Sequence, residues 1–405
     1  MKAKMFLPFI ILAAVPFIMV LGNSMLIPIF PQIKQALDLT PFQVGLIITL
    51  FSLPAGLLIP FAGAFSDHVG RKTIMAPSLL IYGCGGLLAG VASVFIPHPY
   101  PWILVGRVIQ GIGAGGTYQL AMALTSDVFT STERTKVLGY LEAANGFGKV
   151  LSPLLGAALG LISWYVPFFA YGLLALPIAL CVWLFVKEPE SKGAKMTPKE
   201  YLQKLREVFR AKAASLLSAY TAGAIGLFLL FGMLSYLSDE LETKFHIAGF
   251  VKGGVLAIPV GMMSLTAFFG GLFLESHRKL LKPAVITGLA LITIGMTSLP
   301  LGRQAVIPFV SLATLVALGI GMLLPPLNTL ITSATSPDER GLVTCLYGTV
   351  RFFGVAAGPP IFGLLSTHHI GLMFLGGAAI AALGAVIALI WLDPRMMVEE
   401  KQGKA

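Results

Sequence analysis

The chain has 405 residues, of which 56% are hydrophobic and only 11% are charged, and its formal net charge is +10. Soluble domains carry about 25% charged residues, so this composition argues against an ordinary soluble enzyme and indicates an integral membrane protein. The three cysteines, Cys84, Cys181 and Cys345, all lie within apolar runs, which argues against a disulfide framework. The first apolar run begins like a signal peptide but continues to about Pro31, so we interpret it as a retained helix.

Apolar segments of the length that crosses a bilayer recur twelve times along the chain. They predict an all-α integral membrane protein with two pseudo-symmetric six-helix bundles, residues 1–186 and 214–405, joined by a basic cytoplasmic linker at 187–213. The predicted spans are 5–31, 42–66, 73–96, 101–126, 136–161, 164–186, 214–238, 248–274, 281–301, 305–333, 342–366 and 369–392.

Basic residues gather in alternate loops, at both ends of the chain and in the linker. Because cytoplasmic loops carry the excess of Lys and Arg, both termini and the linker are predicted to be cytoplasmic, in a multi-pass protein of the plasma membrane. The positive charge is therefore explained by topology and not by nucleic acid binding. The linker segment TPKEYLQKLREVF has helical spacing. It either lies along the membrane surface or acts as a solvated tether.

The two halves repeat each other at an offset of 206 residues. The tripeptide TER at 132–134 matches DER at 338–340, and GAFSDHVGRK at 63–72 loosely resembles GLFLESHRK at 271–279. The glycines and prolines that match at this offset are Gly113 with Gly319, Gly115 with Gly321, Gly148 with Gly354, and Pro153 with Pro359. Duplicated six-helix halves with a site at the midplane between them are a transporter plan.

The loop after the second span carries the most specific motif. GAFSDHVGRK resembles the loop signature of the major facilitator superfamily, and the matching residues are Gly63, Asp67, Gly70, Arg71 and Lys72. The resemblance implies a conformational latch of the outward-open state, in which Arg71 pairs with Asp127 at the cytoplasmic end of the fourth span. Asp67 is then expected to accept hydrogen bonds from the start of the eleventh span, near Gly341. The alternative is a charged loop that only sets topology.

Two further segments resemble motifs of the same family. In the fourth span, GRVIQGIGAGG at 106–116 places Arg107 near the outer end, where the resemblance implies a role in proton transfer. Outward snorkelling of this side chain is the alternative. In the fifth span, GKVLSPLLGA at 148–157 resembles the motif associated with antiport and efflux, with Gly148, Pro153 and Gly156 in place and Ser152 and Ala157 departing from it. A kinked packing helix is the alternative.

Polar side chains inside the spans are the candidates for substrate and proton binding. Positions 142, 145, 149 and 152 share one helical face and form a polar stripe of Glu, Asn, Lys and Ser. Intramembrane ionisable groups are functional by default, so Glu142 is the predicted proton carrier, with Lys149 and Arg107 assisting; a static packing network is the alternative. The candidate cavity residues are Asn23, Tyr118, Gln119, Asn145, Ser235, Tyr236, Asn328 and Arg351. Asn23 stands where drug antiporters of the family often carry an acid.

The whole chain resembles the bacterial twelve-helix drug:proton antiporters of the major facilitator superfamily. The resemblance implies proton-coupled efflux of hydrophobic or cationic small molecules by alternating access. The expected partners are amphiphilic substrates, protons and membrane lipids, for a monomer without metal, cofactor or nucleic acid. Enzyme activity is not expected, because the sequence has no phosphate loop, metal-ligand spacing or nucleophilic triad. The alternatives are a lipid or glycolipid flippase, in which Arg351 and Lys149 bind an anionic head group, and a non-transporting sensor.

Overall fold

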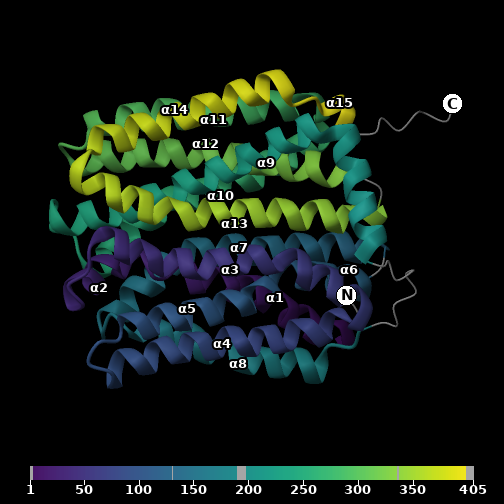
Figure 1. Ribbon diagram of the computed structural model, residues 1–405, viewed down its shortest axis with the longest axis horizontal. Helices are drawn as coiled ribbons and strands as arrows, with labels where there is room; N and C mark the ends of the chain where they lie inside the picture. The colour runs from purple at the N-terminus through teal and green to yellow at the C-terminus, as the bar shows by residue number, and fades with distance from the viewer. Residues whose placement is uncertain (1–2, 130, 189–197, 335–336, 398–405) are drawn as a thin grey trace. The chain divides into compact units, whose positions relative to one another are not determined.

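The computed structural model describes residues 3–129, 131–188, 198–334 and 337–397, and within these ranges the chain is helical without a strand (Figure 1). The elements of the first predicted half are α1 (Ala3–Ser24), η1 (Ile27–Ile29), α2 (Phe30–Ala36), α3 (Pro41–Val69), α4 (Arg71–Phe95), α5 (Tyr100–Gly115), α6 (Tyr118–Val128), α7 (Ser131–Gly160) and α8 (Val166–Phe185). Those that follow are α9 (Pro198–Thr243), α10 (Gly249–Ser276), η2 (Arg278–Leu280), α11 (Leu281–Gly302), α12 (Val306–Ser333), α13 (Pro337–His368), α14 (Ile370–Trp391) and α15 (Pro394–Met397).

Ten helices in the described ranges are long and apolar enough to cross a membrane, so the predicted all-helical, multi-span fold is confirmed. The predicted fourth span is not among the ten because it is divided: α5 ends at Gly115 and α6 begins at Tyr118. The predicted fifth span, α7, is also outside the ten, and it carries the polar stripe within its apolar run.

The helix α14 buries most of its small residues and exposes many of its large apolar ones, as expected where lipid replaces water. In α14 the buried residues are Met373, Phe374, Gly377, Ala378, Ala381, Gly384 and Ala388. Its exposed residues include Leu375, Leu383, Val386, Leu389 and Ile390. The small faces let helices approach closely, and Figure 1 shows α4 beside α8 and α11 beside α14.

The basic linker segment is part of a helix. The helix α9 begins inside the predicted linker and continues into the seventh span, with non-helical angles at Lys212 (φ −130°, ψ 18°). Lys212 Nζ donates a hydrogen bond of 2.6 Å to the carbonyl oxygen of Ala334. The helical expectation for this segment is confirmed, whereas residues 189–197 of the predicted linker lie outside the described residues.

The chain divides into two compact units. Unit 1 comprises Met1–Lys195, Gly232–Ile258 and Pro359–Leu364, and unit 2 comprises Met196–Phe231, Pro259–Gly358 and Leu365–Ala405. Unit 1 therefore contains the first six-span half together with short parts of α9, α10 and α13. The boundaries 1–186 and 214–405 of the repeating halves stay a prediction from the sequence.

Equivalent glycine contacts occur in the two units. A Cβ on Gly113 would lie 2.3 Å from the Tyr82 nitrogen, and a Cβ on Gly319 would lie 2.6 Å from the Gly288 oxygen. Tyr82 and Gly288 are themselves 206 residues apart, so α4–α5 and α11–α12 share one packing geometry. The α1–α7 and α9–α13 contacts match to within one residue: Gly148 lies against Phe17 and Gly354 against Ala224, and these two partners are 207 residues apart. The internal repeat therefore appears as repeated close helix packing.

Candidate functional site

The loop between α3 and α4 holds the predicted ion pair. Gly70 separates the helices at φ +104°, a conformation that favours glycine. Arg71 Nε lies 2.8 Å from Asp127 Oδ2, and Arg71 Nη2 lies 3.6 Å from Asp67 Oδ1. The Gly63 carbonyl accepts a hydrogen bond of 2.7 Å from Ser66. The expected contact of Asp67 with the start of α13 would join the two units and stays a prediction.

Glu188 completes this cluster, and the sequence analysis missed it. Its carboxylate accepts hydrogen bonds from the backbone N–H groups of Arg71, at 2.5 Å, and Lys72, at 3.0 Å. These groups begin α4, where backbone N–H groups have no partner inside the helix and attract negative charge. Lys72 Nζ also lies 5.6 Å above the ring of Trp183. No sequence spacing signalled this contact, because Glu188 follows the sixth span, over 100 residues later.

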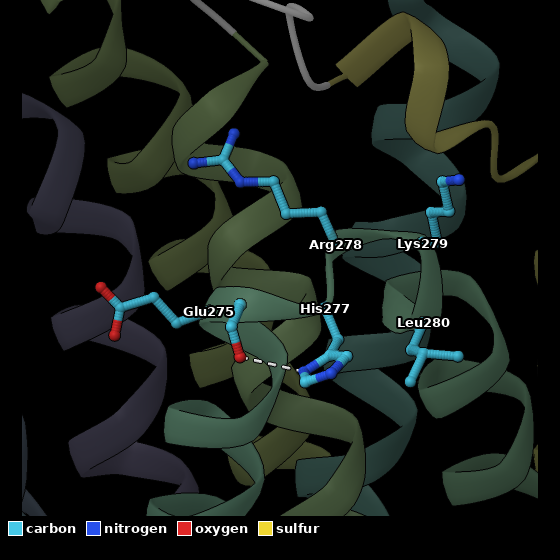
Figure 2. Close-up of a pocket in the computed structure, with 6 residues that line it drawn as sticks. Glu275, His277, Arg278, Lys279 and Leu280 are labelled. Atoms are coloured by element: carbon cyan, nitrogen blue, oxygen red, sulfur yellow. Dashed lines mark hydrogen bonds between the residues drawn. The ribbon is translucent and has the colours of Figure 1, made fainter.

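The corresponding loop of the second half is built differently. Figure 2 shows residues 275–280, with Glu275 and Arg278 extending in different directions. The Ser276 hydroxyl lies 2.9 Å from His277 Nδ1, and the His277 ring stacks on Phe273 at 4.4 Å. Within the described part of the chain no carboxylate pairs with Arg278. The weak sequence match between the two loops therefore does not extend to the ion pair.

Arg107 is fully buried, with 0% exposure, so outward snorkelling is wrong for this side chain. Its guanidinium donates to the oxygens of Gly22 at 2.7 Å, Ile47 at 2.9 Å, Gln110 at 2.6 Å and Asn23 at 2.9 Å. It also lies 4.4 Å above the Phe51 ring. The reason for the inward direction is that α1 and α3 offer acceptors that lipid lacks.

Asn23 belongs to this Arg107 network. It is buried, its Oδ1 accepts from Arg107, and its Nδ2 donates to Ser52 Oγ at 3.3 Å. All the hydrogen-bond partners that the structure describes for Arg107 are neutral. Asn23 stands where drug antiporters of the family often carry an acid. Because asparagine is neutral, the buried guanidinium of Arg107 is held by neutral oxygens.

The four residues of the polar stripe of α7 differ in burial. Glu142 is exposed, and its Oε1 accepts a hydrogen bond of 2.6 Å from the Tyr118 hydroxyl. Asn145 is buried and donates to the Pro16 carbonyl at 3.4 Å, while Ser152 donates to Gly148 at 2.7 Å. The half-buried Lys149 forms no hydrogen bond or ion pair with Glu142, and Glu142 forms none with Arg107. The contacts thus do not bring the three predicted proton-coupling residues together.

The fifth-span motif packs α7 against α1 and η1. A Cβ on Gly156 would lie 2.0 Å from the carbonyl oxygen of Met25, so only glycine fits there. A Cβ on Gly253 would lie 2.7 Å from the carbonyl oxygen of Pro153, which places α10 against the same helix. These contacts show that the motif sets close packing, whatever its role in transport.

Ion pairs in unit 1 join α2 to α9 and α9 to α10. Lys34 pairs with Asp239, and Lys252 pairs with Glu242. Ser238 Oγ donates to the Ile27 carbonyl at 2.7 Å. These pairs were not predicted from the sequence, since Lys34, Asp239 and Glu242 lie outside the predicted spans. Tyr236, a predicted cavity residue, is buried here and donates to Glu240 at 2.7 Å.

The other predicted cavity residues occupy varied surroundings. Gln119 is half-buried on α6, and Asn328 is exposed on α12. The Ser235 hydroxyl is buried without a hydrogen-bond partner among the described residues. Arg351 is half-buried on α13, with its guanidinium carbon 5.2 Å above the Tyr347 ring.

A multi-span helical fold with a duplicated plan and a charged loop after its second span defines a membrane transporter. The family model "Major Facilitator Superfamily" matches residues 12–359 and 282–405, and the chain belongs to this family. It is 39% identical to the bacillibactin exporter of Bacillus subtilis (strain 168), over 97% of this chain and 98% of that protein. It is 24% identical to multidrug resistance protein 1 of the same organism, over 93% and 94%.

Solved structures support the fold. The D-xylose-proton symporter superposes with a TM-score of 0.77, at 13% identity, over 98% of this chain and 100% of that one. The chain is thus a multi-pass membrane transporter of the major facilitator superfamily, as the sequence motifs predicted.

Proposed function

We propose that the chain is a proton-coupled exporter that moves a small organic compound of the bacillibactin type across the cell membrane by alternating access. The 39% identity to the bacillibactin exporter, over nearly the full length of both proteins, supports the substrate. The glycine-proline pattern of α7 supports antiport. Both termini are proposed to be cytoplasmic, in agreement with the positive loops, and the protein is proposed to act as a monomer without nucleic acid.

The observation that carries proton coupling is the hydrogen bond between the Tyr118 hydroxyl and Glu142 Oε1. Tyr118 lies on α6, directly after the break in the fourth span, and Glu142 lies within the apolar run of α7. Glu142 forms no ion pair with a basic residue in the described ranges. A carboxyl group held by a neutral donor takes up a proton without breaking an ion pair, which suits a group that is loaded and unloaded in each cycle.

Glu142→Gln is expected to abolish proton-coupled transport while leaving folding intact, because the glutamine oxygen still accepts from Tyr118. The measurement uses everted membrane vesicles with an acidic interior, an acridine probe and added bacillibactin. Wild type is expected to release protons on addition of the compound, and the variant is not. Glu275→Gln, a change at an exposed position in the last turn of α10, is the matched control. Unchanged proton release by Glu142→Gln would reject Glu142 as the carrier.

Multidrug export is the second candidate, supported by the 24% identity to multidrug resistance protein 1. In this case the substrates are hydrophobic or cationic compounds, as the sequence analysis expected. Adding ethidium to the same vesicles separates the two candidates. Proton release with ethidium but not with bacillibactin favours the multidrug exporter.

Asp127→Asn is expected to slow transport about fivefold, because a half-exposed ion pair contributes up to about 1 kcal/mol to a conformational equilibrium. The side chains of Arg71 and Asp127 are 27% and 39% exposed. In our proposal this pair latches the cytoplasmic ends of the helices, while Lys34 and Asp239 act on the outer side. The rate is measured in the same vesicles beside Asp38→Asn, which removes an exposed acid at positive φ. A wild-type rate for Asp127→Asn would mean that the loop only sets topology.

A further inference from the structure

One face of α13 packs on α9 within unit 2. A Cβ on Gly354 would lie 2.3 Å from the Ala224 carbonyl oxygen, and a Cβ on Gly223 would lie 2.5 Å from the Tyr347 ring. The Tyr347 ring also stacks on Tyr220, with 5.8 Å between centroids. Positions 347, 351 and 354 follow each other at helical spacing. Arg351 therefore lies on the packed face of α13.

Three polar atoms on this face lack partners. Arg351 Nε, the Tyr347 hydroxyl and Thr344 Oγ1 are buried and form no hydrogen bond with the described part of the chain. Tyr347 is only 2% exposed. Seven buried side-chain atoms in the described ranges are without a partner, and three of them gather here within two helical turns. Because buried polar groups are normally hydrogen-bonded, such a cluster indicates a missing ligand.

The fully buried basic side chains of unit 1, Arg107 and Lys252, do have partners. Arg107 donates to four oxygens within 2.9 Å, and Lys252 pairs with Glu242. Asn145, the repeat counterpart of Arg351, donates to the Pro16 carbonyl. Arg351 forms no salt bridge with any described residue. The second half thus presents a cation where the first half presents an amide that is already engaged.

We propose that Thr344, Tyr347 and Arg351 form a subsite that binds an anionic oxygen group, a carboxylate, phenolate or phosphate, of the transported compound. This inference rests on the proposed transport function and names its substrate class. The free Nε and the neighbouring terminal nitrogen of Arg351 offer a side-on pair of donors to two oxygens. The Tyr347 and Thr344 hydroxyls add further donors. The transported compound is therefore an organic anion and not the cation expected from the drug antiporters.

The test compares a matched anion and neutral compound, 1-naphthoate and 1-naphthamide, by calorimetric titration of the full chain in phosphatidylcholine nanodiscs. Wild type is expected to bind naphthoate about tenfold more tightly than naphthamide, and Arg351→Gln is expected to lose this preference. Lys279→Gln, which removes the same charge from an exposed position of η2, is expected to retain this preference. Equal binding of both compounds by wild type, or an unchanged preference in Arg351→Gln, overturns the proposal.

Tyr347→Phe keeps the test decisive if Arg351→Gln does not fold. It removes only the unpartnered hydroxyl and is expected to weaken naphthoate binding about threefold without changing naphthamide binding. Wild-type naphthoate affinity in this variant counts against the subsite. Arg351→Lys is expected to bind naphthoate less tightly than wild type, because lysine keeps the charge but loses the planar fork.

The anionic group has two sources, a soluble compound or a lipid head group. Repeating the titration in nanodiscs that contain phosphatidylglycerol distinguishes them. Weaker naphthoate binding in wild type but not in Arg351→Gln supports the subsite and assigns it to a lipid phosphate. If phosphatidylglycerol leaves the naphthoate affinity of wild type unchanged, the result supports the subsite and assigns it to the soluble compound.

Bacillibactin transport is measured in parallel, so the two proposals fail separately. A wild type that does not transport bacillibactin but prefers naphthoate through Arg351 rejects the proposed function and keeps the subsite. If wild type transports bacillibactin but Arg351→Gln binds naphthoate as wild type does, the proposed function is kept and the subsite is rejected.

Discussion

Arg107→Met is expected to destabilise the protein by at least about 3 kcal/mol, since it leaves several buried oxygens without a donor at roughly 1–3 kcal/mol each. Arg107 is fully buried and donates to acceptors on α1, on α3 and on its own helix. It is the one side chain of the described fourth span that ties these three helices together through hydrogen bonds. Its removal is therefore expected to loosen the helix contacts of unit 1.

The melting temperature, measured by size-exclusion after heating in detergent, is expected to fall by roughly 5 °C. The melting temperature of Arg107→Lys is expected to fall by less than that of Arg107→Met. Lysine keeps the charge but loses the planar fork and its stacking on Phe51. Arg210→Met, at an exposed position of α9, is the control and is expected to melt like wild type. If Arg107→Met also melts like wild type, the network does not support the fold.

Gly156→Ala is expected to cost about 1–3 kcal/mol of stability and to impair transport, because the added methyl group meets backbone and not a flexible side chain. Its Cβ would lie 2.0 Å from the Met25 carbonyl oxygen and 3.0 Å from the Met25 Cα. The turn between α1 and η1, or α7 itself, must then shift. In our proposal α7 closes one end of the transport path by close packing, and the variant is expected to lose this closure.

Gly146→Ala is the matched control on the same helix, since a Cβ there meets nothing within 4 Å. Alanine in place of a helical glycine without a clash is expected to stabilise by up to about 1 kcal/mol. The two variants are compared by melting temperature and by proton release in everted vesicles. Equal melting of Gly156→Ala and Gly146→Ala would contradict a packing role for the motif.

Most of the fold could be predicted from the sequence, because the bilayer sets the length of an apolar helix. The divided fourth span was not predicted: Gly116 and Thr117 leave the helical conformation although the apolar run continues through them. The Arg71–Asp127 pair was predicted from a family motif, and the structure contains it. Glu188 was not predicted, since its role depends on the open start of α4.

The sequence by itself determined the membrane class, the helical spans, the repeat and the identity of the embedded charges. These properties depend on composition and spacing along one chain. Only the tertiary structure decided where each charge points: Arg107 inward to neutral oxygens, Glu142 to Tyr118, and Arg351 onto Tyr347. The physical reason is that the energy of a polar group in an apolar medium depends on its partners, and those partners come from other helices.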